Sequence, residues 1–235
     1  MPDLEFLTVL GLGFLLGARH ALDPDHVAAV SAILSKRPDL HTSGLIGFSW
    51  GFGHTMVLVL VGAAVILLKV NIPAPFTEAC EFGVGVLLVV LGGSLAWTVY
   101  RERWHVHSHR HSGATHLHAH SHRVNPDHGH DHWLKISLRP FLVGMAHGLA
   151  GSAALMLMVV SAVQTVWEGM AYILIFGIGS IFGMMILGLL MSLPLILSAS
   201  FDRRAQIAVQ CLASAGSIGL GLTMMVRIVL GESPL

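Results

Sequence analysis

Two histidines and two aspartates stand close together in an apolar stretch near the N-terminus. Residues 17–30 read GARHALDPDHVAAV and contain His20, Asp25 and His26, with Pro24 among them. Imidazole combined with carboxylate suits borderline divalent metals, whereas magnesium and calcium prefer shells made only of oxygen. The residue types therefore indicate a site for a divalent transition-metal ion, and the spacing alone does not separate nickel, cobalt and zinc.

The surrounding chain is too apolar for an ordinary soluble domain. Of its 235 residues, 54% are hydrophobic and 11% are charged, and the mean hydropathy is +0.73. A soluble domain carries about 25% charged residues. The net charge is zero with neutral histidine, so nothing indicates nucleic-acid binding. Cys80 and Cys211 form no CxxC motif and are interpreted as two small apolar residues. This composition predicts a protein that crosses a lipid bilayer several times.

Six segments are long and apolar enough to cross the bilayer as helices, which takes about 20 residues each. They are residues 4–34, 43–68, 82–100, 139–163, 169–198 and 206–230. We expect an all-α membrane protein with six transmembrane helices. The first segment is too long for one straight crossing, so we expect a break near Pro24.

The break also explains how the two histidines can meet. On an unbroken helix His20 and His26 would point about 240° apart around the axis. Pro24 has no N–H and pushes the preceding residue away from helical angles. A break there frees backbone carbonyls and turns both histidines toward a common centre. The alternative is a loop or a segment end, where charge costs little, but the apolar run resumes at Val27 without a turn signal.

Basic residues predict the orientation in the membrane. The connections after the first, third and fifth segments are expected to be cytoplasmic, with both chain ends outside, because Lys69 is the only basic residue in the alternate connections. The ten basic residues on the expected cytoplasmic side are Lys36, Arg37, Arg101, Arg103, Arg110, Arg123, Lys135, Arg139, Arg203 and Arg204.

The chain repeats part of its own sequence. FLLGARHALDP (residues 14–24) aligns with FLVGMAHGLAG (141–151), and WGFGHT (50–55) aligns more weakly with FGIGSI (176–181). Three segments in each copy would give the copies opposite orientations, as in transporters that bind substrate near the midplane. We therefore expect a 3+3 inverted repeat, in which residues 1–100 and 139–235 are the copies and 101–138 connects them. Glycines four residues apart are expected to let helices approach closely; they include Gly13, Gly17, Gly47, Gly51, Gly179 and Gly183.

The connection between the two copies is rich in histidine. Residues 105–132 hold eleven of the chain's sixteen histidines, largely at alternate positions. Its polarity predicts a flexible cytoplasmic tract that collects metal by mass action at the inner mouth. The alternative is a solvated spacer.

The spacing His20-(four residues)-Asp25-His26 resembles the HX4DH signature of the nickel/cobalt transporter family. Gly53-His54-Thr55 resembles the second motif of that family. The permeases grouped with urease accessory genes are the most similar, because they also combine a proline with the DH pair. The resemblance implies a multi-span metal permease in a bacterial cell membrane. The chain departs from the family pattern in two ways, and both fit the smaller six-span members. It has six apparent spans instead of eight, and MAHGLAGS (145–152) stands in place of an acidic third motif.

These observations define the candidate metal ligands as His20, Asp25, His26 and His54. Asp23 is expected to orient an imidazole or pair with Arg19 rather than bind metal directly. His147 occupies the repeat position of His20 and is either a ligand or a supporting residue, because Ala150, Ser152 and Ala153 replace the remaining ligands there.

The leading functional expectation is uptake of nickel, with cobalt as the second candidate, by a secondary permease. Efflux is the alternative, because histidine-rich loops also occur in related exporters. The chain has no HExxH motif for a metalloenzyme and no Walker motif for nucleotide hydrolysis. We therefore expect a transporter, not an enzyme, without a prosthetic group. A cytoplasmic metallochaperone is a compatible partner, and the sequence specifies no oligomeric state.

Overall fold

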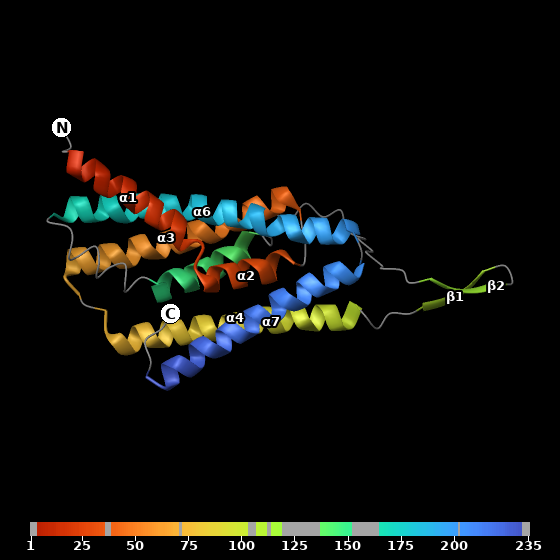
Figure 1. The fold of residues 1–235 in the computed structure, drawn as a ribbon. Coiled ribbons are helices and arrows are strands. Elements are labelled where there is room, and N and C mark those ends of the chain that lie inside the picture. The colour runs from red at the N-terminus through yellow and green to blue at the C-terminus, as the bar shows by residue number, and fades with distance from the viewer. Residues whose placement is uncertain are drawn as a thin grey trace.

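The protein is a bundle of long helices, seen along its length in Figure 1. The computed structural model describes residues 4–35, 39–70, 72–102, 107–111, 114–118, 137–151, 165–201 and 203–231. The labelled helices are α1 (Leu4–His20), α2 (Pro24–Leu34), α3 (Leu40–Leu68), α4 (Ala74–Glu102), α6 (Val166–Phe201) and α7 (Arg203–Val229). Residues 137–151 are also helical. The predominantly helical fold predicted from the composition is confirmed.

Four helices in the described ranges are long and apolar enough to cross a membrane, namely those in Leu40–Leu68, Ala74–Arg101, Val166–Leu197 and Arg204–Val229. The pair α1 and α2 passes the same test together, as a broken crossing or a re-entrant loop, with an angle of 52° between its halves. The break therefore lies where the sequence predicts it, immediately before Pro24. The predicted segment 139–163 is helical up to residue 151, and its remainder lies outside the described residues. A sixth crossing stays a prediction.

The outward faces of the helices are apolar. Leu60 on α3, Val90 on α4 and Leu212 on α7 are 61%, 62% and 73% exposed. In water, so much exposed apolar surface would be an aggregation hazard. In a bilayer these side chains face hydrocarbon, so the surface of the bundle and its composition both describe an integral membrane protein.

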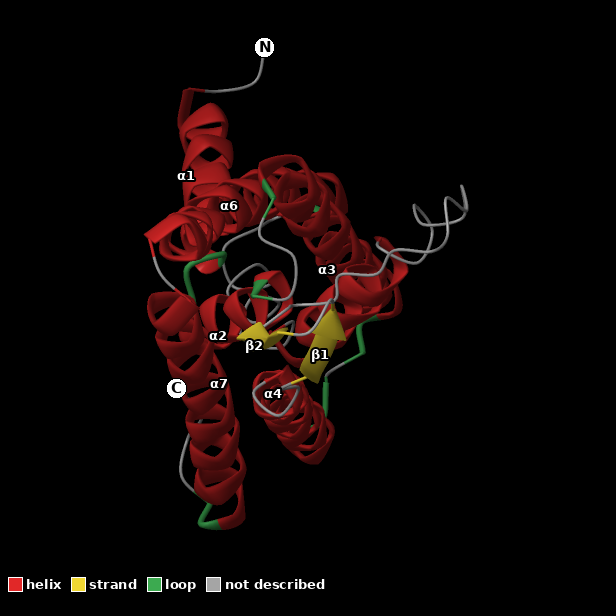
Figure 2. Cartoon of the chain, turned by 90° about the vertical axis from the view of Figure 1, so that its right-hand side faces the viewer, coloured by secondary structure: helices red, strands yellow, loops and turns green. Residues whose placement is uncertain are grey.

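Helices from the two halves of the chain pack against one another. α3 and α1 both pack along α6, and α4 packs along α7. The short helix α2 touches α4, α6 and α7, and Figure 2 shows it between the α1–α6 layer and the α4–α7 pair. Its Ala29, Val30 and Leu34 are fully buried in the main apolar core, beside Trp50 and Leu88. The molecule thus does not separate into a first half and a second half.

Small residues allow the closest helix contacts. A Cβ on Gly17 of α1 would collide with the carbonyl oxygen of Phe176 on α6, and a Cβ on Gly179 of α6 would collide with that of Phe14 on α1. The packing role predicted for these glycines is confirmed. Between α4 and α7, Ser214 donates its hydroxyl to the Gly92 carbonyl at 2.8 Å. Such side-chain bonds also bind helices together where water is absent.

The labelled helices α3, α4, α6 and α7 all begin at least three residues earlier than the sequence predicts, and two of these starts have a visible cause. α3 starts after Asp39, whose carboxylate accepts hydrogen bonds from the backbone N–H and the hydroxyl of Thr42, both at 2.9 Å. These bonds hold the pKa of Asp39 below its usual range. α4 starts at Ala74 instead of residue 82, with Pro73 accepting the N–H of Phe76 at 3.0 Å.

Part of the histidine-rich connection forms a β-hairpin. Strands β1 (His107–His111) and β2 (Ala114–His118) pair antiparallel, with His109 opposite His116, and extend beyond one end of the bundle in Figure 1. The expectation of a flexible tract is therefore wrong for these ten residues. The physical reason lies in the two residues between the strands: Ser112-Gly113 is a turn dipeptide, and a two-residue connection is the commonest in a hairpin. Residues 119–136 lie outside the described residues.

Candidate metal site

The site is built at the break between α1 and α2. His20 is the last residue of α1, and Pro24 is the first residue of α2, where a missing N–H costs nothing. The turn is closed by the N–H of Leu22 on the Arg19 carbonyl at 2.8 Å and by the N–H of Asp23 on the His20 carbonyl at 3.1 Å. The carbonyls of Arg19 and His20 are thus engaged in the turn, so these two are not left free by the break.

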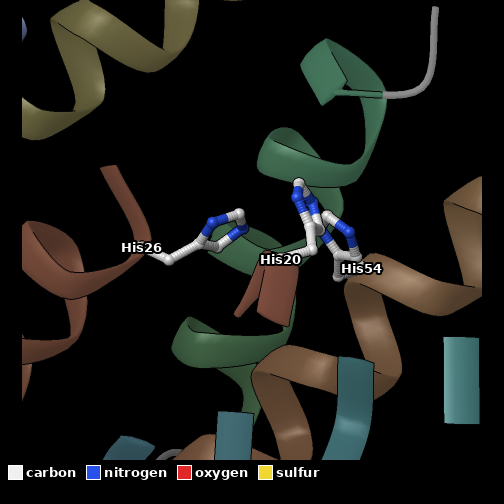
Figure 3. A group of neighbouring side chains, drawn as sticks. All are labelled: His20, His26 and His54. Atoms are coloured by element: carbon white, nitrogen blue, oxygen red, sulfur yellow. The ribbon is translucent and has the colours of Figure 1, made fainter. Parts of the chain in front are cut away.

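Three imidazoles converge at this break, as Figure 3 shows. His20, His26 and His54 come from α1, α2 and α3, and each offers one ring nitrogen within 4.8 Å of the others. The ring centroids of His20 and His26 are 4.9 Å apart, and those of His20 and His54 are 5.1 Å apart. Three nitrogens spread evenly around one ion at about 2.1 Å each lie about 3.6 Å apart. The three rings would therefore have to close in by up to about 1.2 Å to bind one cation together.

Two carboxylates adjoin the imidazoles. Asp23 lies 2.6 Å from Nδ1 of His20, so the expected orienting contact is present and Arg19 is not needed for it. Asp25 lies 3.3 Å from Nδ1 of His26, without the alignment of a hydrogen bond. Asp23, Asp25 and His26 also offer ligand atoms within 4.8 Å of one another. The carboxylates therefore add negative charge beside the three rings.

The helical residues 137–151 bring a fourth imidazole to the site. The ring of His147 lies 5.2 Å from that of His26 and 5.0 Å from the ring of Trp50 on α3. This helix approaches α3 closely because it presents Gly148 to the backbone of His54. His147, which aligns with His20 in the sequence, thus joins the same cluster of histidines.

The sequence reasoning missed Trp50. Its ring is part of the main apolar core and also lies 6.2 Å from that of His26 and 5.0 Å from that of His147, and its indole nitrogen is buried without a hydrogen-bond partner. Trp50 precedes His54 by four residues, so the two share one face of α3. That spacing, in WGFGHT, is the signal that would have identified it.

Buried ring nitrogens without partners define the chemistry of the cluster. Both nitrogens of His26, both of His54 and Nε2 of His147 are buried and lack hydrogen bonds. A neutral imidazole carries a lone pair on one nitrogen, and an unsatisfied buried polar atom costs about 1–3 kcal/mol. A divalent transition metal accepts such lone pairs. The arrangement is therefore suited to a borderline metal cation held by nitrogen and carboxylate oxygen.

Comparison with known proteins agrees with this chemistry. Residues 6–199 match the model of the NicO family, described as a high-affinity nickel-transport protein. The chain belongs to the NicO family. Its NicO region includes the break, the histidine cluster and most of α6, so the resemblance inferred from the HX4DH spacing is confirmed, and the family is one of transporters, not enzymes.

Curated relatives of this NicO protein support the same class. It is 39% identical over 200 residues to the urease accessory protein UreH of Bacillus sp. (strain TB-90), covering 85% of this chain and 82% of the relative. It is 28% identical over 171 residues to a candidate nickel/cobalt efflux system of Methanocaldococcus jannaschii, covering 71% and 67%. It is 25% identical over 183 residues to the Arabidopsis thaliana chloroplast protein FOR GROWTH AND FERTILITY 1, covering 76% and 48%. No solved structure matches the chain.

Proposed function

We propose that this protein is a secondary permease that takes up nickel, with cobalt as a second substrate. The observation that supports this most directly is the convergence of His20, His26 and His54 at a break inside an apolar bundle. Placing ionisable groups inside a membrane is expensive, and such groups usually mark a substrate pathway. The family match supplies the substrate class.

In this proposal His20, Asp25, His26 and His54 bind the ion. Asp23 accepts the N–H of His20 at Nδ1 and so presents Nε2 of that ring to the metal. Only neutral imidazole binds metal, so protons compete with nickel and acid weakens binding.

The membrane arrangement is also part of the proposal. Residues 1–100 and 139–235 would be two inverted three-helix repeats joined by residues 101–138, giving six crossings in a bacterial cell membrane. The bias of basic residues supports termini outside and a cytoplasmic histidine-rich connection, which would collect metal and pass it to a cytoplasmic metallochaperone. Lys36, Arg37 and residues 152–164 lie outside the described residues.

The break suggests which parts move. α1 packs on α6, whereas α2 also contacts α4 and α7, so residues 21–23 connect helices with different neighbours. His20 stands before this connection and Asp25 and His26 stand after it. An ion bound between them joins the two sets of neighbours, and a change in their angle opens or closes the site. We propose this motion as the basis of alternating access.

Efflux is the second candidate function. One relative is described as a candidate nickel/cobalt efflux system, and the histidine-rich connection would then sense excess metal. The intact Asp25–His26 pair favours uptake, because it matches the importer motif.

Accumulation of nickel in cells that express the protein tests the direction. Uptake predicts a rise in cellular nickel, and efflux predicts a fall. His20→Ala should abolish the change, whereas His41→Ala is a matched control because His41 is exposed at the start of α3. Competition by cobalt, zinc and manganese ranks the substrates. Unchanged nickel content in cells with correctly inserted wild-type protein would refute both directions.

A further inference from the structure

One ring nitrogen of His147 forms a hydrogen bond, and the other has no hydrogen-bond partner. Its Nδ1 lies 3.0 Å from the carbonyl oxygen of Val143, one helical turn earlier. A carbonyl oxygen can only accept, so Nδ1 must carry the hydrogen. In the neutral ring Nε2 then carries a lone pair. This Nε2 is buried without a hydrogen-bond partner.

The lone pair of His147 faces a carboxylate. Nε2 lies 3.9 Å from Oδ2 of Asp25, and the His147 side chain is fully buried. Two groups that only accept hydrogen bonds repel each other in a medium of low dielectric unless something positive or a donor lies between them. Nε2 of His147 and Oδ2 of Asp25 therefore require a positive group or a hydrogen-bond donor between them.

The separation of the two atoms is compatible with a bridging metal ion. Two ligand atoms at about 2.1 Å from one ion lie about 3.4 Å apart at a tetrahedral angle and at most about 4.2 Å apart. The observed 3.9 Å lies within this limit, and imidazole nitrogen and carboxylate oxygen are both ligands of divalent transition metals.

We propose that Asp25 and His147, together with His26, form a second position for the transported divalent cation. This proposal rests on the proposed function, in which His20, Asp25, His26 and His54 form the first position. Asp25 and His26 are common to both positions, and the ring of His26 lies 5.4 Å from that of His54 and 5.2 Å from that of His147. The shared ligands make the positions alternatives, so a single ion passes from one to the other while Asp25 and His26 stay bound.

A pair of substitutions separates metal binding by His147 from a structural role. Asn places an amide nitrogen near the position of Nδ1, so His147→Asn keeps a donor for Val143 and removes only Nε2. Gln places its amide near the position of Nε2, so His147→Gln loses the Val143 bond. If His147 is structural, the Gln variant is the damaged one. If Nε2 binds the ion, the Asn variant is damaged in metal handling although it folds.

The test is Co²⁺ binding by the full-length chain in detergent, measured by titration calorimetry and by the visible absorption of bound Co²⁺. Four proteins are compared, namely wild type, His20→Gln, His147→Asn and the double variant. All four keep the histidine-rich connection, so metal bound there contributes equally to each. Each single variant should weaken the membrane-site binding only a few-fold, because one position remains. In the double variant, the fold-loss of Co²⁺ affinity should exceed the product of the two single fold-losses by about tenfold or more.

Uptake supplies the second readout. His147→Asn should lower the maximum uptake rate of Ni²⁺ more than it changes the half-saturating concentration, because loading at the first position is preserved. Wild-type binding and uptake in His147→Asn would overturn the second position. So would a double variant no worse than either single variant, because that indicates one undivided site. If His20→Gln also behaves as wild type, the proposed function itself fails.

Discussion

Replacing Pro24 with alanine tests whether the broken helix creates the site. Proline inside a continuous helix costs about 3 kcal/mol, so its removal stabilises an unbroken α1–α2 helix relative to the bent pair by about that amount. The ratio of unbroken to bent forms then rises by about 150-fold. In the unbroken form the 52° bend is lost and His20 and His26 point about 240° apart around the axis. Pro24→Ala should therefore lose much of its metal uptake.

The assay is the initial rate of Ni²⁺ uptake at limiting Ni²⁺, in cells with equal amounts of membrane-inserted protein. Pro75→Ala is the matched control, because Pro75 is also an exposed proline in the first turn of a helix. The control should transport as wild type. If Pro24→Ala transports equally well, the packing of α2 alone fixes the bend and the proposed role of proline is refuted.

Three further outcomes are expected. Asp23→Asn should weaken apparent Ni²⁺ affinity by about tenfold to a hundredfold with less effect on the maximum rate, because a neutral amide orients His20 less firmly; an unchanged concentration dependence of uptake would contradict this. Gly148→Ala should lose uptake and thermal stability in detergent, because its Cβ would lie 2.6 Å from the carbonyl oxygen of His54, whereas Gly93→Ala, with no neighbour within 4 Å, should change neither. Deleting residues 105–132 should shift the apparent metal affinity measured in uptake curves but leave transport intact; complete loss in a correctly inserted protein would make this tract essential.

The sequence predicts local features of this molecule well, because they depend on neighbouring residues. Pro24 predicts the break, since a proline acts on its own helix. The apolar runs predict the long helices, because these too depend on residues that are neighbours in the sequence. The sequence also predicts that His20 and Asp23 interact, since three positions separate them across the turn.

Contacts between distant helices could not be predicted in this way. The approach of His147 to His26 depends on the packing of residues 137–151 against α3, where Gly144 meets the Trp50 carbonyl and Gly148 meets that of His54. No pattern in one segment identifies its partner. Whether the His20 carbonyl is hydrogen-bonded could not be predicted either, because a tight turn and an open break have the same residues and differ only in their dihedral angles.

The length of α2 has a consequence for the energetics of loading. Its 11 residues span about 16 Å, about half of the roughly 30 Å hydrocarbon layer, and Lys36 and Arg37 follow it after Ser35 in the sequence. In the orientation proposed above, with the C-terminal end of α2 at the cytoplasmic surface, an ion at the start of α2 has crossed about half of the membrane's electric field. For a divalent cation that step is worth about 2.3 kcal/mol per 100 mV, or about 50-fold in occupancy. The resting voltage of a cell, negative inside, would thus act directly on how often the site is filled.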